Sequence, residues 1–145
     1  MPTRTERVLA SLNQVPLFEG LRRGQLERLA KQFVERKYDE GETIVEQGQG
    51  GEGFFIITSG HTEVIRERLD GTKAKVNEFG PTDFFGEMAL LDTGPRTASV
   101  ITTEPTECLA LTRWNFLAVL KEDPDTAIAI LQAMAKRFRM ALDVL

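Results

Sequence analysis

Three residues in the middle of the chain, Gly86, Glu87 and Arg96, have types and spacing that suit the binding of a small anionic ligand. A glycine lets the backbone approach a ligand closely, and the short helical turn expected after Gly86 would present backbone N–H groups, which attract a phosphate. Arg96 follows Glu87 by nine residues and could donate two parallel hydrogen bonds to phosphate oxygens. An ionised Glu87 only accepts hydrogen bonds, so it suits a sugar hydroxyl. The pattern predicts a ligand with one phosphate and a neighbouring hydroxyl; the alternative is a Glu87–Arg96 salt bridge that stabilises a loop.

Short strands must position these residues, because brief apolar runs alternate with glycines over 34–112. This regular spacing is typical of an antiparallel sandwich or barrel. Helical spacing of apolar residues occupies the chain on either side, and Asp123-Pro124 suits the N-cap and first position of the final helix. At this length one domain is the expectation. We therefore predict a single domain with N-terminal helices over 1–33, a β-roll over 34–112 and C-terminal helices over 113–145.

The last predicted helix is apolar over more of its circumference than one core-facing side needs. Six of its residues follow a heptad spacing: Ile128, Leu131, Ala135, Phe138, Leu142 and Leu145. At 100° per residue the apolar arc covers about 200°. The helix could be sunk deeply in its own domain, or it could turn one face to the barrel and the other to a partner chain. The second interpretation predicts a homodimer through this helix, or an unidentified effector protein bound to it.

The segment around Gly86 resembles the phosphate-binding cassette of the cyclic nucleotide-binding domain family, which includes catabolite activator proteins and protein kinase A regulatory subunits. The matching residues are Phe85-Gly86-Glu87-Met88-Ala89-Leu90 and, at the family's spacing, Pro95-Arg96-Thr97-Ala98. The strand and glycine framework matches over nearly the whole chain, although Thr82 stands where many members carry a second glycine. The resemblance implies a mainly β fold, an antiparallel eight-stranded jelly roll flanked by N-terminal helices and a long C-terminal helix.

The resemblance also implies a role for each matched residue of the cassette. Glu87 would accept a hydrogen bond from the ribose 2′-hydroxyl, and Arg96 would pair with the cyclic phosphate. Further contacts around the ribose and phosphate would come from Gly86, Met88, Ala89 and Ala98. The expected ligand is therefore a cyclic nucleotide, cAMP or cGMP, and no other cofactor is implied.

The residues expected near the base of the nucleotide do not settle whether that base is adenine or guanine. Val64 and Val76 would line the base pocket by analogy, and plain core packing is the alternative for each. Thr97 could donate to the phosphate or to a syn purine; such a hydroxyl can favour cGMP, but bacterial cAMP binders place one here too. Arg137 falls where catabolite activators use an arginine as a lid over the base. Those proteins place hydroxyl residues soon after it, where this chain has Ala141 and Leu142, so expected contacts to the adenine edge are missing and base specificity stays open. The resemblance to catabolite activators implies cAMP more than cGMP.

Composition and the remaining reactive residues exclude several other classes of function. The net charge of −4, from 18 basic and 22 acidic residues, argues against a broad surface for nucleic acid. Because Cys108 is the single cysteine, an internal disulfide and a cysteine-based metal site are ruled out. Its apolar surroundings predict an unreactive core residue. His61 reads as a surface residue, and no catalytic set can be assembled around it. No apolar run approaches the roughly 20 residues needed to cross a bilayer, so a cytoplasmic protein with no membrane partner is expected.

Two functions from different classes are compatible with these features. The first is a non-catalytic sensor that binds a cyclic nucleotide and relays binding through its C-terminal helix. The second is a dimeric jelly-roll interaction protein whose pocket is degenerate or takes a different ligand. A regulator that binds DNA directly is not expected, because the sequence shows no helix-turn-helix after the last helix.

Overall fold

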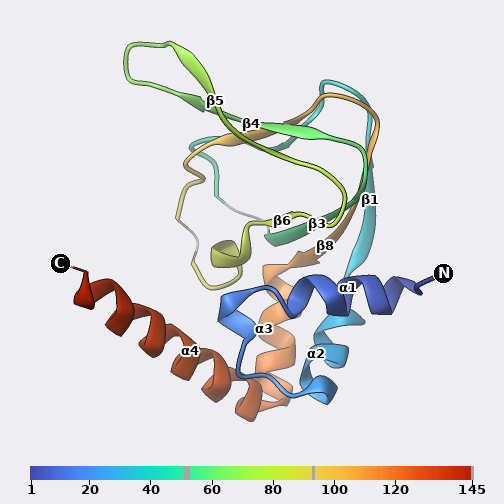
Figure 1. The fold of residues 1–145 in the computed structure, drawn as a ribbon, viewed down its shortest axis with the longest axis vertical. Helices are drawn as coiled ribbons and strands as arrows, with labels where there is room; N and C mark the ends of the chain where they lie inside the picture. Colours follow the sequence, from blue (N-terminus) through green and yellow to red (C-terminus); the bar gives the residue numbers. More distant parts are fainter. Residues whose placement is uncertain (51–52, 93, 145) are drawn as a thin grey trace. The chain divides into compact units, whose positions relative to one another are not determined.

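The computed structural model describes residues 1–50, 53–92 and 94–144, and within them it confirms the predicted jelly roll. Its eight strands are β1 (Val34–Tyr38), β2 (Thr43–Val45), β3 (Gly53–Ser59), β4 (Thr62–Glu67), β5 (Lys73–Phe79), β6 (Phe84–Phe85), β7 (Ser99–Thr102) and β8 (Thr106–Thr112). They form two four-stranded antiparallel sheets, ordered β1-β8-β3-β6 and β2-β7-β4-β5 (Figure 1).

The helices lie on both sides of this region in the chain, as the periodicity predicts. They are α1 (Arg4–Leu12), α2 (Arg23–Ala30), α3 (Arg113–Glu122) and α4 (Pro124–Asp143), with short 3₁₀ turns η1 (Pro16–Phe18) and η2 (Glu87–Leu90). The chain separates into two compact units. We call Phe33–Arg113 the strand unit, and Met1–Gln32 together with Trp114–Leu145 the helical unit. The single-domain organisation stays a prediction.

The core of the strand unit lies between the two sheets. It consists of the buried residues Phe55, Ile57, Phe85, Val100, Cys108 and Ala110. Strand β3 is buried along most of its length, which explains why its sequence is a continuous apolar run instead of an alternating one. Burial also raises the pKa of the Cys108 thiol to about 11, so this cysteine is a poor nucleophile.

Stacked aromatic rings fix strand β6, which leads directly into the cassette. The ring of Phe85 stacks between those of Phe55 and Phe79, with centroid separations of 5.2 Å on each side. The neighbouring Phe84 stacks on Phe54 at 5.6 Å. Such pairs add to the free energy gained by burial alone. The position of the next residue, Gly86, is therefore set by rings on two strands.

The turn before β6 shows why a glycine is typical at position 82. Thr82 has a φ of 75°, in the left-handed region that costs an ordinary residue about 1–2 kcal/mol. Its backbone N–H donates to the carbonyl of Ile57 at 2.8 Å, and that of Asp83 donates to Gly80 at 3.0 Å. These bonds hold the threonine in its strained conformation.

The helical unit packs around its own apolar residues. The rings of Phe18 and Phe116 lie 6.2 Å apart, and Lys136 forms an ion pair of 3.7 Å with Glu19. Helix α4 begins at Pro124 after Asp123, as predicted, and the carboxylate of Asp123 accepts the hydroxyl hydrogen bond of Thr126 at 2.8 Å. None of the helices among the described residues has the length and apolar character that a membrane crossing requires.

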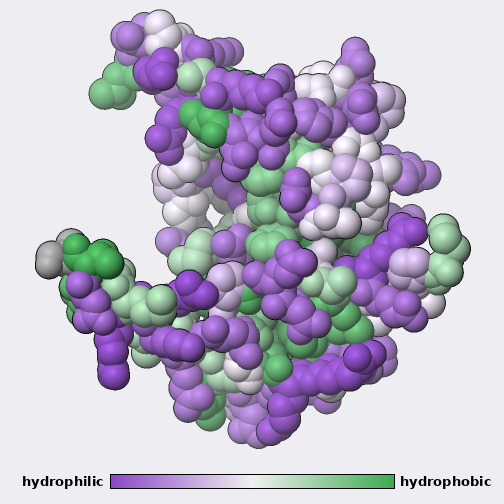
Figure 2. All heavy atoms as spheres, viewed as in Figure 1, coloured by the Kyte–Doolittle hydropathy of each residue, from purple (hydrophilic) through white to green (hydrophobic). Residues whose placement is uncertain are grey.

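Four of the predicted heptad residues on α4 are at least half exposed: Ile128, Leu131, Phe138 and Leu142. The residues of this helix that are buried, Thr126, Ile130 and Ala133, follow a different helical face. Figure 2 shows apolar surface at the C-terminal end of α4. Leu145, the last predicted heptad position, lies outside the described residues. This exposure favours the interpretation that one face of the helix meets a partner, and the partner itself stays a prediction.

Candidate functional site

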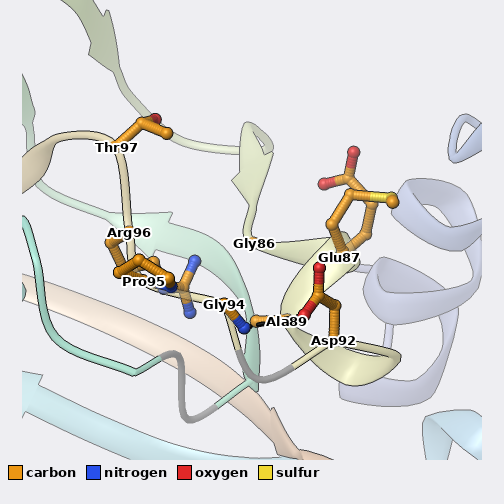
Figure 3. Close-up of a pocket in the computed structure, with 9 residues that line it drawn as sticks. Gly86, Glu87, Ala89, Asp92, Gly94, Pro95, Arg96 and Thr97 are labelled. Carbon is orange, nitrogen blue, oxygen red and sulfur yellow. Dashed lines mark hydrogen bonds between the residues drawn. The ribbon is translucent and has the colours of Figure 1, made fainter.

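A pocket of about 350 Å³ lies in the strand unit along the connection between β6 and β7. Its lining residues are Gly86, Glu87, Met88, Ala89, Asp92, Gly94, Pro95, Arg96 and Thr97 (Figure 3). The volume falls in the range of small-molecule sites. The fold therefore brings six of the predicted site residues to one pocket, and their roles toward a ligand stay predictions.

Gly86 occupies a position in this pocket that no other residue fits. Its φ is 89°, which favours glycine because other residues are strained there. A Cβ atom at this position would lie 2.6 Å from the carbonyl oxygen of Gly53 and 2.7 Å from Nη1 of Arg96. The absence of a side chain at Gly86 thus makes room for the guanidinium of Arg96 against the pocket wall.

The guanidinium of Arg96 is partly buried and directed by a backbone group. Its Nη2 donates a hydrogen bond of 2.8 Å to the carbonyl of Gly53, at the start of β3. A guanidinium carries five N–H donors in a rigid plane, so one side chain can hold Gly53 and also bind an anion. The cationic group is therefore placed in the pocket before any ligand arrives.

The predicted alternative, a Glu87–Arg96 salt bridge, is not supported by the structure. The ion pairs among the described residues do not include this one. Figure 3 shows the Glu87 carboxylate and the Arg96 guanidinium standing apart, with Gly86 between them. Both residues line the same pocket without pairing with each other, an arrangement that suits a ligand carrying both a hydroxyl and an anionic group.

The turn η2 uses some of the backbone N–H groups that were expected to face a ligand. The N–H of Ala89 donates to the carbonyl of Gly86 at 3.0 Å, and those of Leu91 and Asp92 both donate to Met88. A 3₁₀ turn pairs each N–H with the carbonyl three residues earlier, as for Ala89 and Leu91, whereas the N–H of Asp92 reaches back four residues. A ligand contact from Ala89 would therefore need the turn to open or to share this N–H.

Four predicted site residues do not line this pocket: Ala98, Val64, Val76 and Arg137. Ala98 is half-buried directly after Thr97. Val64 packs against the core of the strand unit, in agreement with its alternative interpretation. Val76 is 52% exposed on β5, an edge strand. Arg137 is exposed on α4, in the helical unit, and its role as a lid over the base stays a prediction.

The pocket also contains residues that the sequence analysis did not assign. Asp92 accepts the backbone N–H of Gly94 at 2.7 Å and so shapes the turn that leads to Pro95 and Arg96. The sequence does carry a signal for this hydrogen bond, because an aspartate two residues before a glycine is typical of turns.

Other reactive groups in the described residues do not form a second site. Nδ1 of His61 lies 2.7 Å from the hydroxyl of Thr103, and its Nε2 lies 3.6 Å from Glu78. No group of three or more potential metal ligands comes together within the part of the chain that the structure describes.

Comparison with known protein families gives one match that covers most of the strand unit. A family model described as cyclic nucleotide-binding domain matches residues 35–123. Among curated proteins, the cyclic AMP receptor protein of Thermus thermophilus is 37% identical over 126 residues, 87% of this chain and 58% of its own. A CRP-like cAMP-activated global transcriptional regulator of Mycobacterium tuberculosis is 28% identical over 128 residues, 88% of this chain and 57% of its own. The chain thus spans less than two thirds of these relatives.

Solved structures show the same similarity. The N-terminal domain of a transcriptional regulator from Streptomyces coelicolor has a TM-score of 0.80 and 30% identity, with 92% of this chain and 94% of that one covered. The catabolite activator protein of Thermus thermophilus has a TM-score of 0.67 and 36% identity, with 90% and 62% covered. The regulatory domain of Toxoplasma gondii protein kinase A with cAMP has a TM-score of 0.70 and 30% identity, with 81% and 45% covered.

Proposed function

Because the chain belongs to the cyclic nucleotide-binding domain family, of the catabolite activator and protein kinase A regulatory-subunit type, we propose that it is a sensor module for a cyclic purine mononucleotide. The observation that carries this proposal is the placement of Gly86, Glu87 and Arg96 around one pocket. The preference for cAMP over cGMP rests on the two curated relatives, a cyclic AMP receptor protein and a cAMP-activated transcriptional regulator. The module is proposed to be non-catalytic and cytoplasmic.

The chemistry of each group matches one part of the ligand. The cyclic phosphate carries one negative charge, which Arg96 can bind through paired N–H donors. The Glu87 carboxylate accepts the ribose 2′-hydroxyl. We infer that binding is relayed through α4, with Arg137 on the base and movement of the segment from Phe85 to Leu91. A ligand shifts such an equilibrium only by its difference in affinity for the two states.

Calorimetric titration of the chain with cAMP and cGMP tests the proposal, and dissociation at micromolar concentration or below is expected for cAMP. The ribose contact is isolated with 2′-deoxy-cAMP, which we expect to bind about tenfold more weakly because one charge-assisted hydrogen bond is lost. In Glu87→Ala, which removes the acceptor oxygens, this discrimination should largely disappear. Glu40→Ala serves as the control and should behave as wild type, because Glu40 is exposed in the turn between β1 and β2. No binding of either nucleotide would contradict the proposal.

A second candidate function is favoured by the exposed heptad face of α4. The side chains of Leu131 and Phe138 are each more than half exposed. They lie one heptad apart, as in a helix that pairs with a second copy of itself. We expect sedimentation to show a dimer, and Leu131→Glu with Phe138→Glu to convert it to a monomer. Gln132→Glu on the same helix is the control. A monomer at high micromolar concentration, with and without nucleotide, would refute dimerisation, whereas a dimer that binds no nucleotide would favour an interaction protein.

A further inference from the structure

Gln47, in the connection between β2 and β3, holds the end of β4 through both ends of its side-chain amide. Its Nε2 donates to the carbonyl of Glu67 at 2.9 Å, and its Oε1 accepts the N–H of the same residue at 2.7 Å. The backbone N–H of Gln47 donates to Oγ of Ser99 at 2.9 Å. We call this set of three hydrogen bonds the Gln47 clamp. It ties one short segment to two different strands.

The residues that follow Gln47 carry the backbone of Arg96. The N–H of Gly48 donates to the carbonyl of Arg96 at 2.9 Å, and the N–H of Arg96 donates to the carbonyl of Gln49 at 2.9 Å. Gly50 and Pro95 form an isolated antiparallel bridge. Both backbone groups of Arg96 are thus bonded to a segment outside the named strands, so the position of Arg96 depends on how firmly that segment is held.

A second hydrogen bond connects β4 to the residue that follows Arg96. Nε of Arg66 donates to the carbonyl of Thr97 at 3.3 Å. The end of β4 therefore supports two consecutive cassette residues, Arg96 through the Gln47 clamp and Thr97 through Arg66. Neither Gln47 nor Arg66 lines the pocket, so any effect that they have on a ligand is indirect.

We propose that Gln47 is a positioning residue for phosphate binding: its amide, fixed on Glu67, keeps the segment over 47–50 in the one conformation that orients Arg96 toward the pocket. This inference rests on the proposed function. The physical reason is that a ligand binds with an apparent dissociation constant equal to its intrinsic value divided by the fraction of molecules in the competent conformation. Loss of two hydrogen bonds in a partly exposed loop leaves several conformations of similar free energy, and about a tenfold loss of affinity is expected.

The chain offers a matched pair of variants for the test. Gln47→Met removes both amide groups and keeps the length of the side chain. Gln49→Ala changes the same residue type two positions later, where the side chain is exposed and the backbone carbonyl that receives Arg96 is retained. Affinity for cAMP is measured by calorimetry, the melting temperature by calorimetric unfolding, and hydrogen exchange of the Arg96 N–H by NMR without ligand.

We expect Gln47→Met to weaken cAMP binding about tenfold and to speed exchange of the Arg96 N–H by a similar factor, while its melting temperature stays close to that of Gln49→Ala. Arg66→Gln should weaken binding by less, since the Gln47 clamp remains. Equal affinities for Gln47→Met and Gln49→Ala, or unchanged exchange at Arg96, would overturn the inference. If the wild-type chain binds neither nucleotide, the proposed function is wrong. The hydrogen-exchange rate of the Arg96 N–H in Gln47→Met then still decides whether Gln47 holds Arg96 in position. Should Gln47→Met not fold, Gln47→Ala is read in the same way.

Discussion

Arg96→Ala is expected to weaken cAMP binding by about a hundredfold or more, because it removes the cation that two charge-assisted hydrogen bonds to the phosphate require. The structure supports a specific geometric role, since Arg96 is already directed by the carbonyl of Gly53 at 2.8 Å and by backbone bonds on both sides. Arg96→Lys keeps the charge but offers a single ammonium in place of a planar fork. It should recover only part of the lost affinity.

The controls for this prediction separate phosphate binding from damage to the loop. Adenosine has no phosphate, so any affinity that it shows for the pocket should be the same in wild type and in Arg96→Ala. The unfolding free energy of both variants is measured by urea denaturation to detect a general loss of stability. Micromolar binding of cAMP that survives Arg96→Ala would remove Arg96 from the phosphate site.

Gly86→Ala is expected to have the second large effect, on both stability and binding. A left-handed φ costs an ordinary residue about 1–2 kcal/mol, and the new methyl group would also approach the carbonyl of Gly53 at 2.6 Å. The total loss in unfolding free energy should reach about 2–4 kcal/mol. The methyl group would also displace the Arg96 guanidinium, which it approaches at 2.7 Å, so binding of cAMP should fall about as far as in Arg96→Ala.

Gly71 provides the matched control for Gly86. It has nearly the same backbone conformation, with a φ of 86°, but nothing lies within 4 Å of the position of its Cβ. Gly71→Ala should therefore show only the conformational cost, about 1–2 kcal/mol, and should bind cAMP as wild type does. The difference between the two variants measures the crowding at Gly86. If both lose the same stability and Gly86→Ala still binds, the close approach of Gly86 to Arg96 is not functional.

Much of the fold could be predicted from local sequence because its signals are local. The alternation of short apolar runs and glycines over 34–112 corresponds to strands that begin at Val34 and end at Thr112. Asp123-Pro124 correctly marks the start of α4. Glu87 and Arg96, which the family resemblance singles out through a fixed spacing, line one pocket in the structure, and their roles toward a ligand stay predictions.

What could not be predicted depends on contacts between distant parts of the chain. Spacing alone left open whether Glu87 and Arg96 pair with each other, and the partner of Arg96 turned out to be Gly53, 43 residues away. Gln47 looks like any polar loop residue in the sequence, because its bonds to Glu67 span 20 residues. Val76 falls on an edge strand, where an apolar residue in a strand pattern need not be buried. Each of these cases depends on which distant segments or neighbouring strands the fold brings together, and a single sequence does not encode that in a form that can be read directly.

The most direct test of a cyclic nucleotide bound by this cassette is a crystal structure of the chain with cAMP at saturating concentration. We predict phosphate oxygens within hydrogen-bonding distance of the Arg96 guanidinium and the ribose 2′-hydroxyl on the Glu87 carboxylate, with Gly86 retaining its left-handed φ of about 89°. A nucleotide bound elsewhere on the chain, or one bound here with its phosphate away from Arg96, would contradict it.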